Sequence, residues 1–270
     1  MRIICLSLAI AATTVVTLSA QVNISSLSTT TTITFDSTLA GVSNGQFAGA
    51  GFQPSPSTGQ LDSDAWAVTG WSDGALAFGG TRTTTSDYAR GSVTAAVTTG
   101  GIYAQGSTDR QLMIQPGGSD WAPGTLTLKI QNNTGFAMST WNLGYELYVR
   151  NDQGRSNSFN FSYSTDDINY TSVTTGNFAY TSAAAADASP VWALISTLST
   201  SVNATVSNNG YLYIRWSGAD VGGSGSRDEF GLDDIAISAV PESNQVGVAV
   251  GALLGVLILM RRRKAARMAA

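Results

Sequence analysis

Histidine is absent from this sequence of 270 residues, and Cys5 is its single cysteine. A chain without imidazole has no Ser-His-Asp or Cys-His nucleophilic site, no histidine-ligated zinc and no imidazole proton shuttle. Because Cys5 lies in a leader that we expect to be removed, disulfides and thiol chemistry are also excluded from the mature protein. Its stability must therefore come from a hydrophobic core.

Basic residues are scarce between the two ends of the chain, where Lys129 is the only lysine. The formal net charge is -4, and the body carries -9 once Arg2, Glu242 and the five basic residues beyond position 260 are set aside. An acidic body repels phosphate backbones, which excludes nucleic acid as a partner. A glycine-rich phosphate-binding loop that ends in Gly-Lys is missing as well.

The N-terminus has the order of a secretory signal peptide. Arg2 precedes an apolar run from Ile3 to Ala12, and small and β-branched residues continue to Ala20. This run has the length of a signal-peptide core and is shorter than the ~20 residues that span a bilayer. We expect residues 1–20 to direct export and to be cleaved after Ala20. The alternatives are an uncleaved anchor and a short buried strand.

The C-terminus has the order of a membrane anchor. Residues 246–260 are uncharged and apolar with interspersed glycines, and the basic stretch 261–264 follows directly. As a transmembrane helix the run is ~22 Å long, which crosses a thin bilayer when its flanks snorkel. The basic stretch stays in the cytoplasm by the positive-inside rule, and the body is then outside.

A short motif links the body to this anchor. It consists of Val240, Pro241, Glu242 and Ser243, and the basic stretch at the other side of the apolar run begins with Arg261, Arg262 and Arg263. Segment 240–270 thus resembles the PEP-CTERM sorting signal of Gram-negative bacteria. The resemblance implies recognition and removal of the tail by an exosortase in the inner membrane, and association of the protein with the cell surface or an exopolysaccharide matrix. Ser243 departs from the usual Pro-Glu-Pro; an unprocessed tail would remain a C-terminal anchor.

Residues 21–239 form the body, in which short segments alternate between apolar and polar side chains. The clearest of them are 125–130, 143–149, 159–163 and 211–216. Alternation with period two is typical of half-buried strands, and turns rich in Asn, Asp and Gly separate the segments. The sequence therefore predicts an all-β fold, an antiparallel β-sandwich of the jelly-roll type in one domain. The only helical turn is expected at Ala183–Ala186.

The end of the body supports the same prediction. Residues 231–235 read Gly-Leu-Asp-Asp-Ile just before the sorting motif. In this respect the chain resembles the jelly-roll domains of many secreted bacterial proteins, a similarity that implies the fold and no particular activity.

Paired carboxylates are the catalytic chemistry that the composition leaves open. Glycoside hydrolysis needs two acids ~5–10 Å apart, one of them with a raised pKa. Glu146 and Glu229 are the only glutamates of the body, and Glu146 lies on the polar face of an alternating segment, as a solvated side chain would. A secreted, carboxylate-dependent hydrolase of the glycosidase kind therefore remains an alternative.

An acidic segment begins the last predicted strand. It contains Asp228, Glu229, Asp233 and Asp234 after a loop rich in Gly and Ser. Residues two apart in a strand face the same side. If Ile235 faces the core, Asp233 therefore also points inward, where a carboxylate needs a partner. Structural calcium is one such partner, because it binds carboxylate and carbonyl oxygens. Backbone amides or a nearby arginine would serve as well.

Aromatic residues suggest a ligand for the surface, because exposed rings stack on sugars. The candidates for this carbohydrate platform are Trp66, Trp71, Trp121 and Tyr148, and their alternative role is core packing. The sequence as a whole predicts an exported, non-enzymatic surface or matrix protein. Its expected partners are an exosortase-type enzyme, the inner membrane and extracellular polysaccharide. A structural scaffold without a ligand is the third possibility, beside the hydrolase.

Overall fold

The computed structural model of the protein describes residues 21–27 and 29–241. Within them the regular structure is β, apart from the single 3-10 turn η1 (Gly176–Phe178). This confirms the all-β prediction. No helix in the described part of the chain is long and apolar enough to cross a membrane. The predicted signal peptide at 1–20 and the predicted membrane helix at 246–260 lie outside the described residues.

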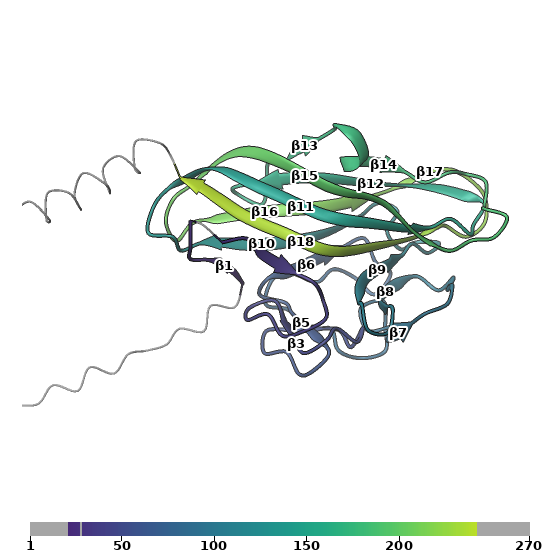
Figure 1. Ribbon diagram of the computed structural model, residues 1–270. Helices are drawn as coiled ribbons and strands as arrows, with labels where there is room; N and C mark the ends of the chain where they lie inside the picture. The colour runs from purple at the N-terminus through teal and green to yellow at the C-terminus, as the bar shows by residue number, and fades with distance from the viewer. Residues whose placement is uncertain (1–20, 28, 242–270) are drawn as a thin grey trace, which may run out of the picture.

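Two large sheets and one small sheet make up the fold (Figure 1). Sheet A has eight strands: β1 (Val22–Ile24), β6 (Trp66–Thr69), β10 (Gly124–Asn132), β12 (Arg155–Ser164), β13 (Thr171–Val173), β14 (Ala179–Thr181), β16 (Tyr211–Gly218) and β17 (Asp220–Gly223). Sheet B has seven: β2 (Thr31–Ile33), β7 (Ser92–Val93), β8 (Gly101–Gln105), β9 (Gln111–Gln115), β11 (Met138–Arg150), β15 (Trp192–Val206) and β18 (Glu229–Pro241). Sheet C has three: β3 (Ser43–Asn44), β4 (Phe52–Gln53) and β5 (Gln60–Asp62).

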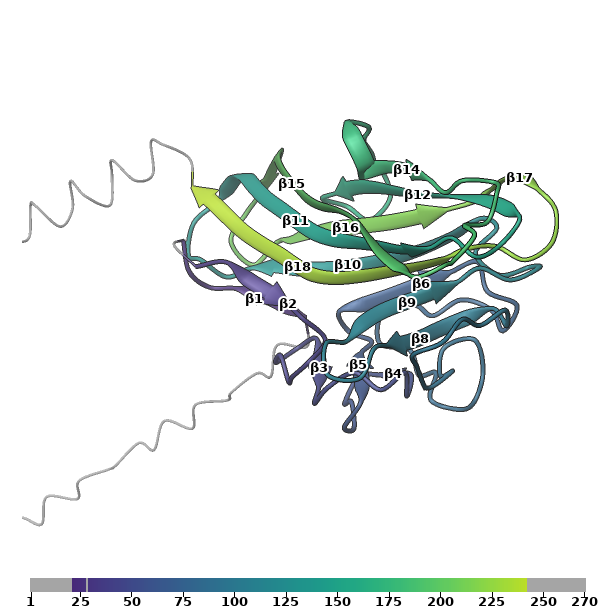
Figure 2. The ribbon, with the colours of Figure 1, turned by 45° about the vertical axis from the view of Figure 1, so that its right-hand side comes forward.

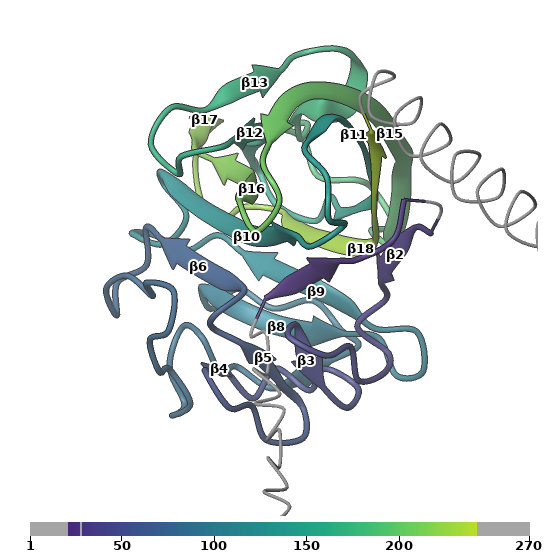
Figure 3. The ribbon, with the colours of Figure 1, turned by 90° about the vertical axis from the view of Figure 1, so that its left-hand side faces the viewer.

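Sheets A and B pack face to face as a sandwich. Figure 3 looks along the sandwich, with β10, β12 and β16 on one side of the core and β11, β15 and β18 on the other. Sheet C and strands β7 and β8 form a lobe beneath this sandwich (Figure 2). The long strands pair antiparallel, as in β10 with β16 and β11 with β15 and β18. The predicted antiparallel sandwich is therefore present.

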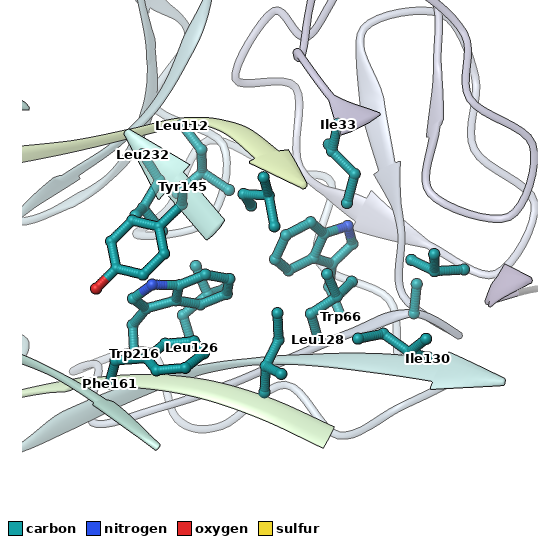
Figure 4. Packing of buried hydrophobic residues seen from close by; sticks show 14 of the residues in the cluster. Ile33, Trp66, Leu112, Leu126, Leu128, Ile130, Tyr145, Phe161, Trp216 and Leu232 are labelled. Atoms are coloured by element: carbon teal, nitrogen blue, oxygen red, sulfur yellow. The ribbon is translucent and has the colours of Figure 1, made fainter. Parts of the chain in front are cut away.

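Alternating apolar residues fill the space between the sheets. All four segments that the sequence singled out are strands, and their apolar positions are buried, for example Leu126 and Leu128 of β10. Tyr145 of sheet B packs edge-on against Trp216 of sheet A, with ring centroids 5.5 Å apart and an interplanar angle of 84° (Figure 4). Such an aromatic pair stabilises a core by about 1 kcal/mol beyond its buried area. Cross-sheet contacts of this kind hold the sandwich together.

Trp121 joins the sandwich to the lobe. Its ring centroid lies 5.9 Å from that of Trp71 in the lobe and 6.2 Å from that of Phe159 in sheet A. Trp66, also fully buried, packs on Phe35 with centroids 6.1 Å apart. Buried residues of the lobe and of the sandwich thus belong to one contiguous core.

The helical turn predicted at Ala183–Ala186 is wrong. These alanines are exposed and form no helix. A run this short cannot offset the cost of helix nucleation unless one face packs against a core.

Candidate functional site

The outer face of sheet B carries the best candidate site. Along β11, residues Leu143, Tyr145 and Leu147 point into the core, so Gly144 and Glu146 point outward. A hollow of about 470 Å³ lies over this face where β15, β11 and β18 run side by side. It is lined by Thr30, Asn142, Leu143, Gly144, Tyr145, Glu146, Thr197, Leu198, Ser199, Asp234, Ala236 and Ser238. Hydroxyl, amide and carboxylate groups predominate among its outward side chains.

A β-bulge in β18 shapes one wall of the hollow. Asp234 has a φ of +46°, and the pairing of β18 with β11 shifts register between Gly144 and Glu146. Ala236 is the partner of Gly144, whereas Asp233 is the partner of Glu146. Paired residues project to the same side of a sheet, so Asp233 lies on the outer side with Glu146. Gly144 also allows β15 to approach, since a Cβ there would lie 2.7 Å from the carbonyl oxygen of Leu198.

The inward orientation predicted for Asp233 is therefore wrong. Parity along β18 predicts that Asp233 and Ile235 share a face, and the extra residue at Asp234 reverses that relation. Ile235 still faces the core, where it is 1% exposed. Asp233 is covered on the other side of the sheet and is 3% exposed.

Carboxylates give the hollow its chemistry. The hydroxyls of Tyr148 and Thr197 donate to the two oxygens of Glu146, at 2.7 and 3.0 Å. Burial raises the pKa of Asp233 to about 8, although its carboxylate accepts the amide of Asp234 at 2.8 Å. Burial also raises the pKa of Asp234, and the negative charges of Glu146 and other acids add to this effect. The hollow thus combines fixed acceptors with a neighbouring acid, Asp233, whose pKa is raised.

Two aromatic residues continue the same face beyond Glu146. Tyr148 is partner to Gly231 in β18, and Trp192 lies at the start of edge strand β15, opposite Arg150. A Cβ at Gly231 would lie 3.2 Å from Cβ of Tyr148 and 3.3 Å from the ring of Trp192, so the indole extends across the sheet to the space above Gly231. The resulting surface, Tyr148 with Trp192, is called the aromatic pair below. Both residues are partly exposed.

Two of the buried polar atoms without a hydrogen-bond partner lie at the aromatic pair. The same Cβ at Gly231 would lie 2.5 Å from Oε1 of Gln111, and this buried oxygen accepts no hydrogen bond from the described residues. The indole nitrogen of Trp192 is likewise buried and without an acceptor. Buried polar atoms are normally paired, and exceptions tend to mark functional positions.

A buried carboxyl pair lies at the far end of the face. Glu229 is fully buried, and its Oε1 accepts the amide of Val97 at 3.0 Å. Burial, and secondarily the neighbouring carboxylate of Asp152, raise the pKa of Glu229 to about 8. Arg150 donates to Asp152 at 3.0 Å. The buried Glu229 thus lies beside a carboxyl group that Arg150 holds in place.

The predicted calcium ligands do not come together. Asp228 accepts the amide of Gln153 and Glu229 accepts that of Val97, whereas Asp233 accepts the amide of Asp234 and Asp234 lines the hollow. Residues 21–27 and 29–241 contain no group of three or more such side chains that could hold a metal ion. Backbone amides, the alternative partner from the sequence, donate to three of the four carboxylates: Asp228, Glu229 and Asp233.

The predicted carbohydrate platform is mostly wrong. Trp66 and Trp121 are fully buried and Trp71 is 5% exposed, because Trp66 packs on Phe35 in the core and the rings of Trp71 and Trp121 pack on each other. Only Tyr148 lies on an outer face. Sequence reasoning missed Trp192, because the alternation of apolar residues in β15 begins only at Leu198.

The sorting motif falls at the limit of the described residues. Val240 and Pro241 end strand β18, and Val240 is 40% exposed. The remaining motif residues, Glu242, Ser243, Arg261, Arg262 and Arg263, lie outside the described residues.

Comparisons with known proteins find no matching family and no matching curated protein. Among solved structures, the chain is similar to a carbohydrate-binding module specific for non-crystalline cellulose (10% identity, 52% of this chain, 80% of the module, TM-score 0.33). It is also similar to a xylan-binding domain of Xyn10C from Paenibacillus barcinonensis (11% identity, 55% and 86% covered, TM-score 0.31). A third similar structure is TmCBM61 in complex with β-1,4-galactotriose (12% identity, 49% of this chain, 72% of TmCBM61, TM-score 0.27). At these scores no ligand and no site carries over to this chain.

Proposed function

We propose that this protein is an exported bacterial surface or matrix protein whose jelly-roll body binds polysaccharide along the outer face of sheet B. The observation that carries the proposal is the direct contact between the aromatic pair and the hollow: the hydroxyl of Tyr148 donates to Glu146 at 2.7 Å. A stacking surface and a row of hydrogen-bonding groups thus form one continuous strip across three strands.

This strip has the chemistry that a sugar chain requires. The apolar face of a pyranose stacks on an aromatic ring, while its hydroxyls need acceptors and donors at the edges. Glu146 and Asp234 supply acceptors, and Asn142 with neighbouring serines supplies both kinds of group. A strip open to solvent, rather than an enclosed pocket, suits a segment within a long polysaccharide.

The proposed activity is binding without catalysis. A glycosidase needs two carboxyls separated across the scissile bond, with the acid reachable by substrate. Glu229 has the raised pKa of such an acid, yet it lies against Asp152 and is fully buried. Its interactions with Val97 and Asp152 are those of a structural pair.

Substitution of each residue of the aromatic pair by alanine tests the binding function. Trp192→Ala and Tyr148→Ala are each expected to weaken polysaccharide binding about tenfold, because the loss of one stacked ring costs about 1.4 kcal/mol. Affinity electrophoresis and calorimetry against a panel of soluble polysaccharides provide the measurement. Tyr213→Ala removes a ring from the outer face of sheet A and is the matched control. Equal affinities for all three variants and the wild type would contradict the proposal.

Export and sorting are the second part of the proposal. They rest on the resemblance of segment 240–270 to a PEP-CTERM signal and on the predicted signal peptide at 1–20. An exosortase-type enzyme and the inner membrane are then the partners of the tail. Cell fractionation with mass measurement of both mature ends should find a chain that begins at Gln21 outside the cytoplasm. Recovery of the intact product in the cytosol would refute this part.

A further inference from the structure

The hollow on sheet B is acidic, and the described residues that line it include no basic side chain. Glu146 and Asp234 are its charged lining residues. The charges that act on Asp234 come from Glu146, Asp109 and Asp36, all of them negative. A neutral sugar needs acceptors, but it gains nothing from unopposed negative charge. The acidic lining of the hollow is therefore not explained by binding of neutral sugars.

We propose that this hollow binds amino sugars that carry a free ammonium group, as in a glucosamine-rich polysaccharide. The inference rests on the proposed polysaccharide-binding function and names its ligand class. An ammonium group has three N–H donors and a positive charge, and it needs carboxylate or hydroxyl acceptors around it. Glu146 and Asp234 supply the carboxylates, and Thr197 and Ser199 contribute hydroxyls from β15.

The aromatic pair gives the same ligand its second contact. Tyr148 donates to Glu146, which ties the ring to the carboxylate and sets both on one side of β11. A sugar ring over Trp192 therefore lies within the same strip as the charged hollow. Cation–π attraction also favours a positively charged sugar over such rings.

An independent observation at this strip also points to a ligand. Oε1 of Gln111 is buried, aims at the space above Gly231 beside the aromatic pair and accepts no hydrogen bond from the described residues. Gln111 is 6% exposed. Once the side chains that cover this oxygen move aside, a sugar hydroxyl or ammonium seated on the aromatic pair would supply the donor that it lacks.

Two oligomers that differ only in charge test the proposal. The probes are a hexamer of β-1,4-linked glucosamine and its fully N-acetylated counterpart, titrated by calorimetry into the purified full-length protein at mildly acidic pH. We expect the glucosamine hexamer to bind about tenfold more tightly, and its advantage to shrink as salt screens the charges. Equal affinities at every salt concentration would overturn the inference and leave the proposed function standing. Failure of both hexamers, together with all the panel polysaccharides, would refute the proposed function itself.

Charge-removing variants test which residues cause the preference for the glucosamine hexamer. Glu146→Gln and Asp234→Asn are expected to abolish most of the tenfold advantage while binding of the acetylated hexamer persists. Asn tolerates the positive φ at position 234, so the bulge is retained. Asp220→Asn, which removes the same charge at an exposed position in β17, is the control and should leave the preference unchanged. An equal loss in Asp220→Asn would show a general effect of net charge and would overturn the site.

Calcium distinguishes a sugar site from a metal site. Millimolar calcium and a chelator should leave the affinity for glucosamine unchanged apart from ionic-strength effects. If calcium at constant ionic strength displaced the hexamer, the hollow would be a cation site and the proposal would be wrong.

Discussion

At the scale of single residues, small side chains make room for the large ring of Trp121. Trp121 is fully buried and has a φ of +56°. Gly218 in β16 lies directly against its indole: a Cβ there would overlap Nε1 of Trp121 and would lie 2.7 Å from the carbonyl oxygen of Ser158. Neither neighbour can move easily, because one is a packed core ring and the other is backbone.

Gly218→Ala is therefore expected to destabilise the protein by about 3 kcal/mol through overpacking. Gly222→Ala, in neighbouring strand β17, meets no atom within 4 Å and should change stability by less than about 0.5 kcal/mol. Urea unfolding of both variants measures the difference. An unfolding free energy of Gly218→Ala equal to that of Gly222→Ala would show that the contact with Trp121 relaxes without cost.

Trp121 also shows why the tryptophans predicted for the sugar platform are buried. A tryptophan in a glycine-rich segment can be exposed on a turn or covered by it, and spacing does not distinguish the two. Here Gly70, which follows β6, has a φ of +81°, and a Cβ there would collide with the backbone at Pro123 and Gly124. Close backbone approaches of this kind cover Trp71 and Trp121, and they depend on contacts distant in the sequence.

At the scale of elements, alternation predicted the strands that have one buried and one polar face. β10, β11, β12 and β16 were found in this way. Strand β15 was missed, since its first half is exposed on both sides and its Ser and Thr residues resemble a loop. The two- and three-residue strands of sheet C are too short for any periodicity.

The position of the candidate site could not be predicted from the alternation of apolar and polar residues, because it depends on a β-bulge in β18. One extra residue at Asp234 moves Asp233 to the outer face and places Asp234 at the hollow. Asp tolerates positive φ better than most residues, so two consecutive aspartates are compatible with a bulge without requiring one. The acids were identified from the sequence, but their positions depended on the register between β18 and β11.

At the scale of the whole molecule, buried acids make stability depend on pH. Folding raises the pKa of Glu229 from 4.5 to about 8 and that of Asp233 from 3.8 to about 8, mainly by burial. Between about pH 4.5 and pH 8 the folded state thus holds protons that the unfolded state has released. Stability from these groups is fully present below this range and is lost as the pH rises through it.

Thermal melts across this range provide the test. The melting temperature should fall from pH 5 to pH 8, and the double variant Glu229→Gln/Asp233→Asn should show a flatter dependence, because its neutral amides mimic the protonated acids. A wild-type melting temperature that rises over the same interval would mean that these acids are ionised in the folded protein.

The position of β18 has a mechanical consequence for whatever is attached after Pro241. The strand lies between β11 on one side and β9 and β2 on the other, and the chain leaves the body from its end. Antiparallel hydrogen bonds run perpendicular to the strands, so tension along β18 loads many of them together in shear instead of peeling them apart singly. If the body is tethered through this strand and binds polysaccharide, as proposed, it would resist being pulled open by the drag of the bound polymer.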